Sequence, residues 1–157
     1  MKGTRQRAIG GAHHAAPSSL PPYASRLIRS ARIGHLATAD RSGQPHVVPI
    51  CFASDADYFY SPIDEKPKRT APAKLKRLRN IAENPQVSLI IDRYDEDWSK
   101  LAYVLITGKA RVMMRGQRHR RAIELLRKKY PQYRCMAIEM RPMIALVAKR
   151  ITVWLAH

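Results

Sequence analysis

The stretch Ile33–Ser54 has the sequence IGHLATADRSGQPHVVPICFAS, and it determines the fold that we expect for the rest of the chain. Two segments rich in strand-forming residues flank Asp40–Gly43, and Gly43 can adopt the positive φ that a tight turn requires. These features predict a β-hairpin. Pro45 and Pro49 carry no N–H, so we expect the second strand at a sheet edge or where ladder hydrogen bonds are missing. Such a strand either faces water or turns its backbone towards a ligand.

Hydrophobic periodicity outside this hairpin predicts further strands and helices. Strands are expected at Tyr58–Tyr60, Gln86–Asp92, Leu101–Met114, Met136–Ala148 and Ile151–Leu155, and helices at Leu20–Arg32, Ala73–Glu83 and Gly116–Tyr130. Gly108, inside the longest strand, indicates a bulge or a close backbone approach. Many strands in antiparallel hairpins, with helices inserted between them, predict a small α+β barrel.

The length of 157 residues is typical of one domain. Residues 1–22 are rich in Gly, Ala, Ser and Pro and contain no acidic residue, which predicts a disordered leader before a single domain over residues 23–157. The chain contains no apolar run of about 20 residues, the length that a membrane-spanning helix needs. Cys51 and Cys135 lie far apart and form no metal-binding motif, so we expect a reduced, cytoplasmic protein.

The charge balance is unusual, because 29 Lys and Arg residues face 12 Asp and Glu residues and give a formal net charge of +17. An anionic partner is therefore expected, although charge alone does not decide between a phosphate ligand, nucleic acid and a membrane surface. A cluster of cations follows the strand at Tyr58–Tyr60 and includes Lys66, Lys68, Arg69 and Lys74. This basic segment is either a phosphate site or a solvated basic surface.

No sequence motif for catalysis is present, since GxGxxG, GxxxxGK[ST], GxSxG and HExxH are all missing. No set of nucleophile, base and orienting residue can be assembled either. We therefore assign no catalytic residue and no metal ligand. If the protein is an enzyme, the reactive atom is expected to belong to a cofactor.

Several segments resemble the pyridoxamine 5′-phosphate oxidase-like superfamily of split β-barrel flavin and deazaflavin proteins. They are IGHLATADRSGQPHVVPICFA, YFYSPIDEKPKR, KLKRLRNIAENPQVSLIID, YDEDW and YVLITGKARV, in this order and with these spacings. The arrangement is most similar to the actinobacterial branch of coenzyme F420-dependent enzymes. The resemblance extends from about Ile33 to the C-terminus.

The resemblance implies a six-stranded antiparallel split barrel with flanking helices, and a homodimer with the cofactor across its interface. It also implies an oxidoreductase that uses coenzyme F420, or FMN, and transfers hydride to or from a small organic substrate. By this resemblance the cofactor ring lies along Val47, Val48, Pro49 and Ile50. The phosphate end lies at Tyr60, Ser61, Lys66, Lys68, Arg69 and Lys74, and Trp98 covers the pocket.

The sequence departs from the oxidase in its second strand, PHVVPIC, which lacks the Arg and Lys that the oxidase has there. We therefore do not expect oxidation of pyridoxamine phosphate. The alternative hypothesis is a non-catalytic, basic polyanion- or nucleic-acid-binding protein on a barrel scaffold, with Tyr58 and Tyr60 stacking on bases. We favour the cofactor hypothesis, in which neither nucleic acid nor a membrane is a partner. Haem binding has only scattered histidines in its support.

Overall fold

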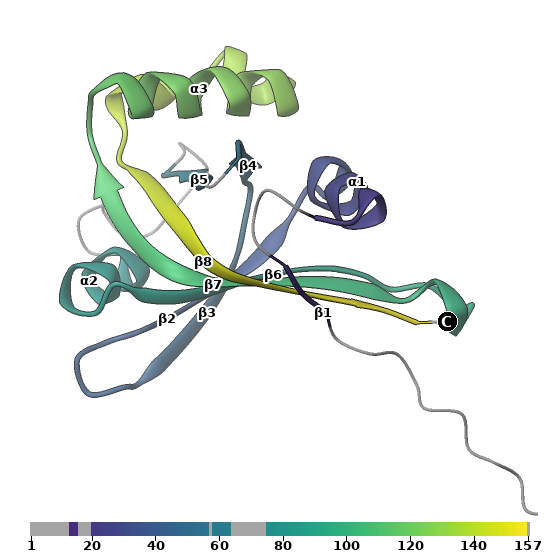
Figure 1. Ribbon diagram of the computed structural model, residues 1–157. Helices are drawn as coiled ribbons and strands as arrows, with labels where there is room; N and C mark the ends of the chain where they lie inside the picture. Colours follow the sequence, from purple (N-terminus) through teal and green to yellow (C-terminus); the bar gives the residue numbers. More distant parts are fainter. Residues whose placement is uncertain (1–12, 16–19, 57, 64–74, 157) are drawn as a thin grey trace, which may run out of the picture.

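The computed structural model of the chain describes residues 13–15, 20–56, 58–63 and 75–156 (Figure 1). The strands are β1 (His13–Ala15), β2 (Gly34–Ala39), β3 (Pro45–Ile50), β4 (Ala53–Ser54), β5 (Tyr58–Pro62), β6 (Gln86–Arg93), β7 (Ala102–Met113) and β8 (Met143–Leu155). The α-helices are α1 (Pro22–Ser30), α2 (Lys76–Glu83) and α3 (Gln117–Lys129), and the 3₁₀ turns are η3 (Trp98–Lys100), η4 (Pro131–Arg134) and η5 (Ile138–Met140). The three predicted helices are confirmed.

All strand pairs in the described residues are antiparallel, and the strand order is β3-β2-β6-β7-β8-β5-β4, with β1 paired to β8. The sheet is a strongly curved half-barrel (Figure 1). The α+β class is thus confirmed, but the path has seven strands and not the predicted six. β1 lies within the segment that we expected to be a disordered leader.

The second strand of the initial hairpin was expected to be continuous, but it is divided into β3 and β4. The division falls at Cys51–Phe52. The backbone N–H of Phe52 donates to the hydroxyl of Tyr130 at 3.0 Å and not to a neighbouring strand. This hydrogen bond to a residue 78 positions away explains why the ladder stops there.

The first hairpin otherwise forms as predicted. Gly43 has φ 84°, and its N–H donates to the carbonyl of Asp40 at 3.0 Å. The Asp40 carboxylate accepts from Ser42 and from the backbone of Gln44, which together with the nearby Lys76 lowers the pKa of Asp40. β3 lies at one end of the strand order, as its two prolines predict.

The C-terminal strands differ from the prediction. Met136–Ala148 and Ile151–Leu155 were expected to be separate, but β8 runs without a break from Met143 to Leu155. A register shift between Thr107 and Gly108 of β7 leaves Lys149 as an extra residue in β8. Lys149 and Arg150, in the middle of this segment, are therefore accommodated by a β-bulge and not by a turn. The bulge predicted at Gly108 is confirmed.

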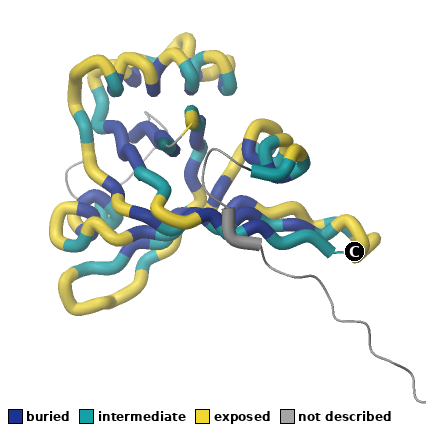
Figure 2. The backbone as a smooth tube through the Cα atoms, in the orientation of Figure 1, coloured by how far each residue is buried: buried dark blue, intermediate teal, exposed yellow. Residues whose placement is uncertain are grey.

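α1 and α2 pack on one face of the sheet, and α3 packs on the opposite face, against β4, β5 and the first half of β8. Ala24 and Ile28 of α1 and Leu78 and Ile81 of α2 join one buried cluster, which contains inward side chains of most strands. A second cluster lies under α3 and includes Tyr60. The buried residues, dark blue in Figure 2, lie mainly where the strands and the helices pack against each other. None of the described helices has the length and apolar character needed to cross a membrane.

The outer face, as we call it, is the side of β3, β2, β6, β7 and the second half of β8 that points away from α1 and α2. Strand register defines its rows of side chains. One row is Val47, Ala37, Ser88, Thr107 and Arg150, and the next is Pro49, His35, Ile90, Leu105 and Thr152. A stacked pair, Tyr103 and Trp154, extends this mostly apolar face, with ring centroids 5.6 Å apart.

Candidate functional site

The four residues predicted to face a cofactor ring do not share one side of β3. Val47 is 58% exposed and Pro49 is also exposed, and both belong to the outer face. Val48 packs against the main buried cluster, and Ile50 is part of it. A ligand beside β3 would therefore meet the side chains of Val47 and Pro49, and the main chain of the other two.

The outer face next to β3 is hollowed. A depression of about 370 Å³ is lined by Ala37, Pro45, Ser88 and Thr107, with Lys149 at the bulge. A second depression of about 380 Å³ lies farther along the same face, beside the Tyr103–Trp154 pair. Flat apolar surface flanked by hydroxyl groups and a cation suits a planar ring system that carries polar substituents.

Tyr60 and Ser61 are both buried in the middle of β5, but successive strand side chains point to opposite faces. Tyr60 joins the cluster under α3, whereas its neighbours Phe59 and Ile63 join the main cluster. Ser61 therefore points to the side that Tyr60 does not. Tyr60 and Ser61 are neighbours in the sequence, but their side chains lie on opposite faces of β5. They cannot contact one ligand from the same direction.

Trp98 is 71% exposed in η3, on the connection between β6 and β7. Asp97 fixes this turn, since its carboxylate accepts from the backbone N–H of Ser99 at 3.1 Å and pairs with Lys100 at 3.0 Å. The connection joins Arg93 to Ala102, and Ala102 lies opposite Leu155 of β8.

Trp98 and Tyr60 lie at opposite ends of one protomer. Tyr60 pairs with Ala145, ten residues before Leu155 along β8. At about 3.3 Å per residue, this separation corresponds to roughly 30 Å. Lys66, Lys68, Arg69 and Lys74, the predicted phosphate contacts, lie outside the described residues.

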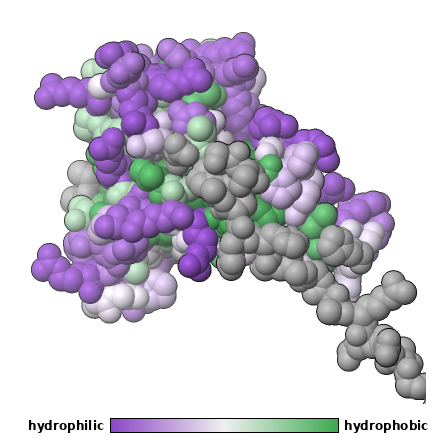
Figure 3. Space-filling model, in the orientation of Figure 1, coloured by the Kyte–Doolittle hydropathy of each residue, from purple (hydrophilic) through white to green (hydrophobic). Residues whose placement is uncertain are grey.

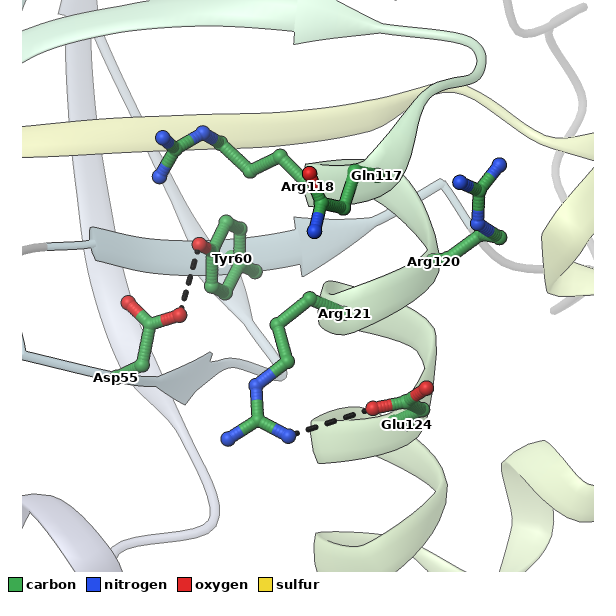
Figure 4. A pocket seen from close by; sticks show the side chains of 7 residues that line it. All are labelled: Asp55, Tyr60, Gln117, Arg118, Arg120, Arg121 and Glu124. Carbon is green, nitrogen blue, oxygen red and sulfur yellow. Dashed lines mark hydrogen bonds and ion pairs between the residues drawn. The ribbon is translucent and has the colours of Figure 1, made fainter.

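A further cavity, of about 450 Å³, lies between α3 and the β4–β5 hairpin (Figure 4). Its lining residues are Asp55, Tyr60, Gln117, Arg118, Arg120, Arg121 and Glu124. The Tyr60 hydroxyl donates to the Asp55 carboxylate at 3.0 Å, and burial is the main cause that raises the pKa of Tyr60 to about 12. Hydrophilic side chains gather over α3 on the face drawn in Figure 3.

The sequence pattern of the family described as pyridoxamine 5′-phosphate oxidase matches residues 20–156, which is nearly the whole chain. The chain belongs to this family. The match includes every described element from α1 to β8.

A curated relative of this family member is a 5a,11a-dehydrotetracycline/5a,11a-dehydrooxytetracycline reductase from Streptomyces rimosus. The two are 30% identical over 95 residues, which cover 60% of this chain and 64% of the reductase. The chain therefore matches less than two thirds of the length of this relative.

Solved structures share the fold at low sequence identity. The conserved hypothetical protein Rv2991 from Mycobacterium tuberculosis has a TM-score of 0.69 and 21% identity, over 90% of this chain and 88% of that one. The heme storage protein HutZ from Vibrio cholerae has a TM-score of 0.66 and 15% identity, with 86% and 93% covered. An FAD-binding protein from Mesorhizobium loti has a TM-score of 0.64 and 19% identity, with 93% and 99% covered. These likenesses show that the fold is shared.

For this member of the pyridoxamine 5′-phosphate oxidase family, sequence reasoning missed the cavity under α3. Arg118 and Arg121 are three residues apart and therefore share a helix face. That spacing is visible in the sequence. What the sequence lacks is the placement of this face opposite Asp55 and Tyr60.

Proposed function

We propose that this protein is an oxidoreductase that binds coenzyme F420, or alternatively FMN, and transfers hydride to or from a small organic substrate. The observation that carries the proposal is the exposed edge strand β3 beside the hollowed outer face, in a chain that belongs to a family named for a flavin-type oxidase. The reductase relative supports an organic substrate. The bound cofactor would supply the hydride chemistry, and the protein would bind and orient the reactants.

In this proposal the ring lies along Val47 and Pro49, whose side chains offer an apolar surface without competing donors. The backbone of Val48 and Ile50 would contact polar edges of the ring. Lys66, Lys68, Arg69 and Lys74 would hold the phosphate end, because cationic side chains neutralise a phosphate dianion. Ser61, whose buried side chain points towards the main cluster, would contribute only its main chain. Tyr60 would then act from the other face of β5, by packing under α3 and fixing the position of the strand.

A homodimer fits this arrangement. The outer face exposes apolar side chains of five strands, and a second copy of the chain could cover them. Along β8, the position beside Tyr60 and the position beside Ala102, next to the connection that holds Trp98, are roughly 30 Å of strand apart, which places the two residues too far apart for one small cofactor to touch both within a protomer. We therefore assign Trp98 to the cofactor site of the partner subunit.

Removal of one cation from the basic segment tests the phosphate site. Lys68→Ala should weaken binding of the cofactor by about tenfold or more, because a charge-assisted contact with phosphate is lost. Lys128→Ala removes an exposed cation from the far end of α3 and is the matched control. Equal affinities of the wild type, Lys68→Ala and Lys128→Ala in a fluorescence titration would refute the assignment of the phosphate site.

A further inference from the structure

A cavity of about 590 Å³ lies between α1 and one end of the sheet, on the side that points away from the outer face. The sheet supplies one row of side chains to it, because Arg93 of β6, Ala102 of β7 and Leu155 of β8 are register partners. The neighbouring row on the same face is completely buried in the main cluster and consists of Ile91, Val104 and Val153. The cavity is therefore the open end of the space that α1 covers.

α1 lines this cavity with a helix face that changes from apolar to cationic. Tyr23 and Leu27 are one turn apart and pack against the main cluster, so they form the apolar side of the face. Arg26 and Ser30, also one turn apart, form the next and more exposed row. Arg29 lies farther round the helix. The cavity thus has an apolar floor and a cationic rim.

The cations on the sheet side of the cavity are already paired. Arg93 pairs with Asp95 at 2.9 Å, and Lys100 pairs with Asp97 at 3.0 Å. None of the described residues that line the cavity is acidic. Arg26 forms no ion pair, hydrogen bond or ring contact with another described residue. It is therefore a guanidinium without a counter-ion at the edge of an apolar floor.

We propose that this cavity binds a hydrophobic monocarboxylate, whose carboxylate pairs with Arg26 and whose apolar body lies over Leu27 and Leu155. A planar guanidinium fork matches the two oxygens of one carboxylate, so a single arginine is sufficient for the head group. Removal of the apolar body from water supplies the rest of the affinity. The volume is in the range of pockets that hold small ligands. The inference does not rest on the cofactor, because the proposed ring site at Val47 and Pro49 lies on the other side of the sheet.

The test is a titration of the full-length protein with decanoate below micelle formation, followed by calorimetry and by amide chemical shifts. Decanoate should bind saturably and shift the amides of α1 and of the ends of β6 and β7 that line the cavity. Decanol, which lacks the charge, and acetate, which lacks the apolar body, should each bind about tenfold more weakly or worse. From butanoate to decanoate, each added methylene should raise the affinity by up to about fourfold.

Removal of the unpaired cation separates the head group from the apolar body. Arg26→Gln should weaken binding of decanoate by about tenfold or more and leave the affinity for decanol within about twofold. Arg79→Gln removes an exposed cation from α2, the other helix on this side of the sheet, and is the matched control with unchanged affinities. Thermal unfolding checks that both variants are folded.

Several results would overturn the proposal. Equal losses in Arg26→Gln and Arg79→Gln would show only general electrostatic attraction. Equal affinities for decanoate and decanol, or shift changes confined to the outer face, would be equally damaging. Displacement of decanoate by FMN or F420 would make the cavity part of the cofactor site. Binding to vesicles of phosphatidylglycerol without binding of monomeric decanoate would make it a membrane contact, and either result would also overturn the proposal.

Discussion

The ammonium group of Lys129 lies 3.8 Å from the centroid of the Phe52 ring. Its Nζ also donates to the backbone carbonyl of Ile28 at 3.0 Å. One side chain thus joins the end of α3 to the end of α1 and to the connection between β3 and β4. Burial is the main cause that lowers the pKa of Lys129 to about 8, and the nearby Arg32 lowers it further.

Lys129 should make stability depend on pH in the alkaline range. Its pKa is lower in the folded protein than the ordinary 10.5, so between about pH 8 and 10.5 the unfolded chain binds more protons. The free energy of unfolding therefore rises with pH across this range. Relative to Lys129→Met, the wild type should gain about 1 kcal/mol between pH 7.5 and 9.5, a value discounted for partial exposure of the group. Urea unfolding measures it, and parallel pH profiles would contradict it.

Tyr130→Phe should destabilise the protein by about 1–3 kcal/mol, because it leaves a buried N–H without its acceptor. The Tyr130 hydroxyl accepts from Phe52 at 3.0 Å and lies 2.8 Å from the carbonyl oxygen of Arg32. Tyr94→Phe is the control, since Tyr94 is 66% exposed, and its effect should stay within about 0.5 kcal/mol. Chemical denaturation compares the two, and similar losses would rule out the Tyr130 hydroxyl as a structural link.

Gly108→Ala should cost about 3 kcal/mol, because a Cβ at this position would overlap the backbone carbonyl of Val147. Backbone atoms of β8 cannot move aside as a flexible side chain would. Gly43→Ala is the comparison: the space around Gly43 is open, but its φ of 84° disfavours alanine by about 1 kcal/mol. Thermal unfolding should rank Gly108→Ala as the more damaging, and the reverse order would be inconsistent with a tight β7–β8 bulge.

Local chemistry was enough to predict the hairpin turn at Gly43, the edge position of β3 and the bulge at Gly108. The division of β3 from β4 could not be predicted in this way, because it depends on a hydrogen bond between Phe52 and Tyr130. Long-range contacts of this kind leave no local pattern.

In the candidate site, too, some features could be predicted from local sequence and others depend on long-range contacts. The alternation of strand side chains separates Tyr60 from Ser61, and that period is present in the sequence. The distance between Tyr60 and Trp98 depends on how β5 and β7 pair with β8. The cavity at Arg118 depends on the docking of α3, which only the folded chain establishes.

Val47→Asp should weaken self-association by placing a charge on the proposed dimer face. We expect a shift towards monomer in sedimentation velocity. A loss of cofactor affinity should accompany it, because Val47 itself lies along the proposed ring site and Trp98 would no longer be supplied by a partner. Met140→Asp is the matched control, because Met140 is 75% exposed in η5 and lies outside the outer face. A Val47→Asp protein with unchanged association would contradict the assignment of the outer face as the dimer interface.

The central claim is that this family member binds a flavin-type cofactor. The most direct measurement is a fluorescence titration of the wild-type protein with coenzyme F420 and, separately, with FMN. We predict saturable binding with one site per protomer, to F420 in preference to FMN. Binding of neither cofactor, together with steeply salt-dependent binding of single-stranded DNA, would contradict the account and favour the polyanion-binding alternative.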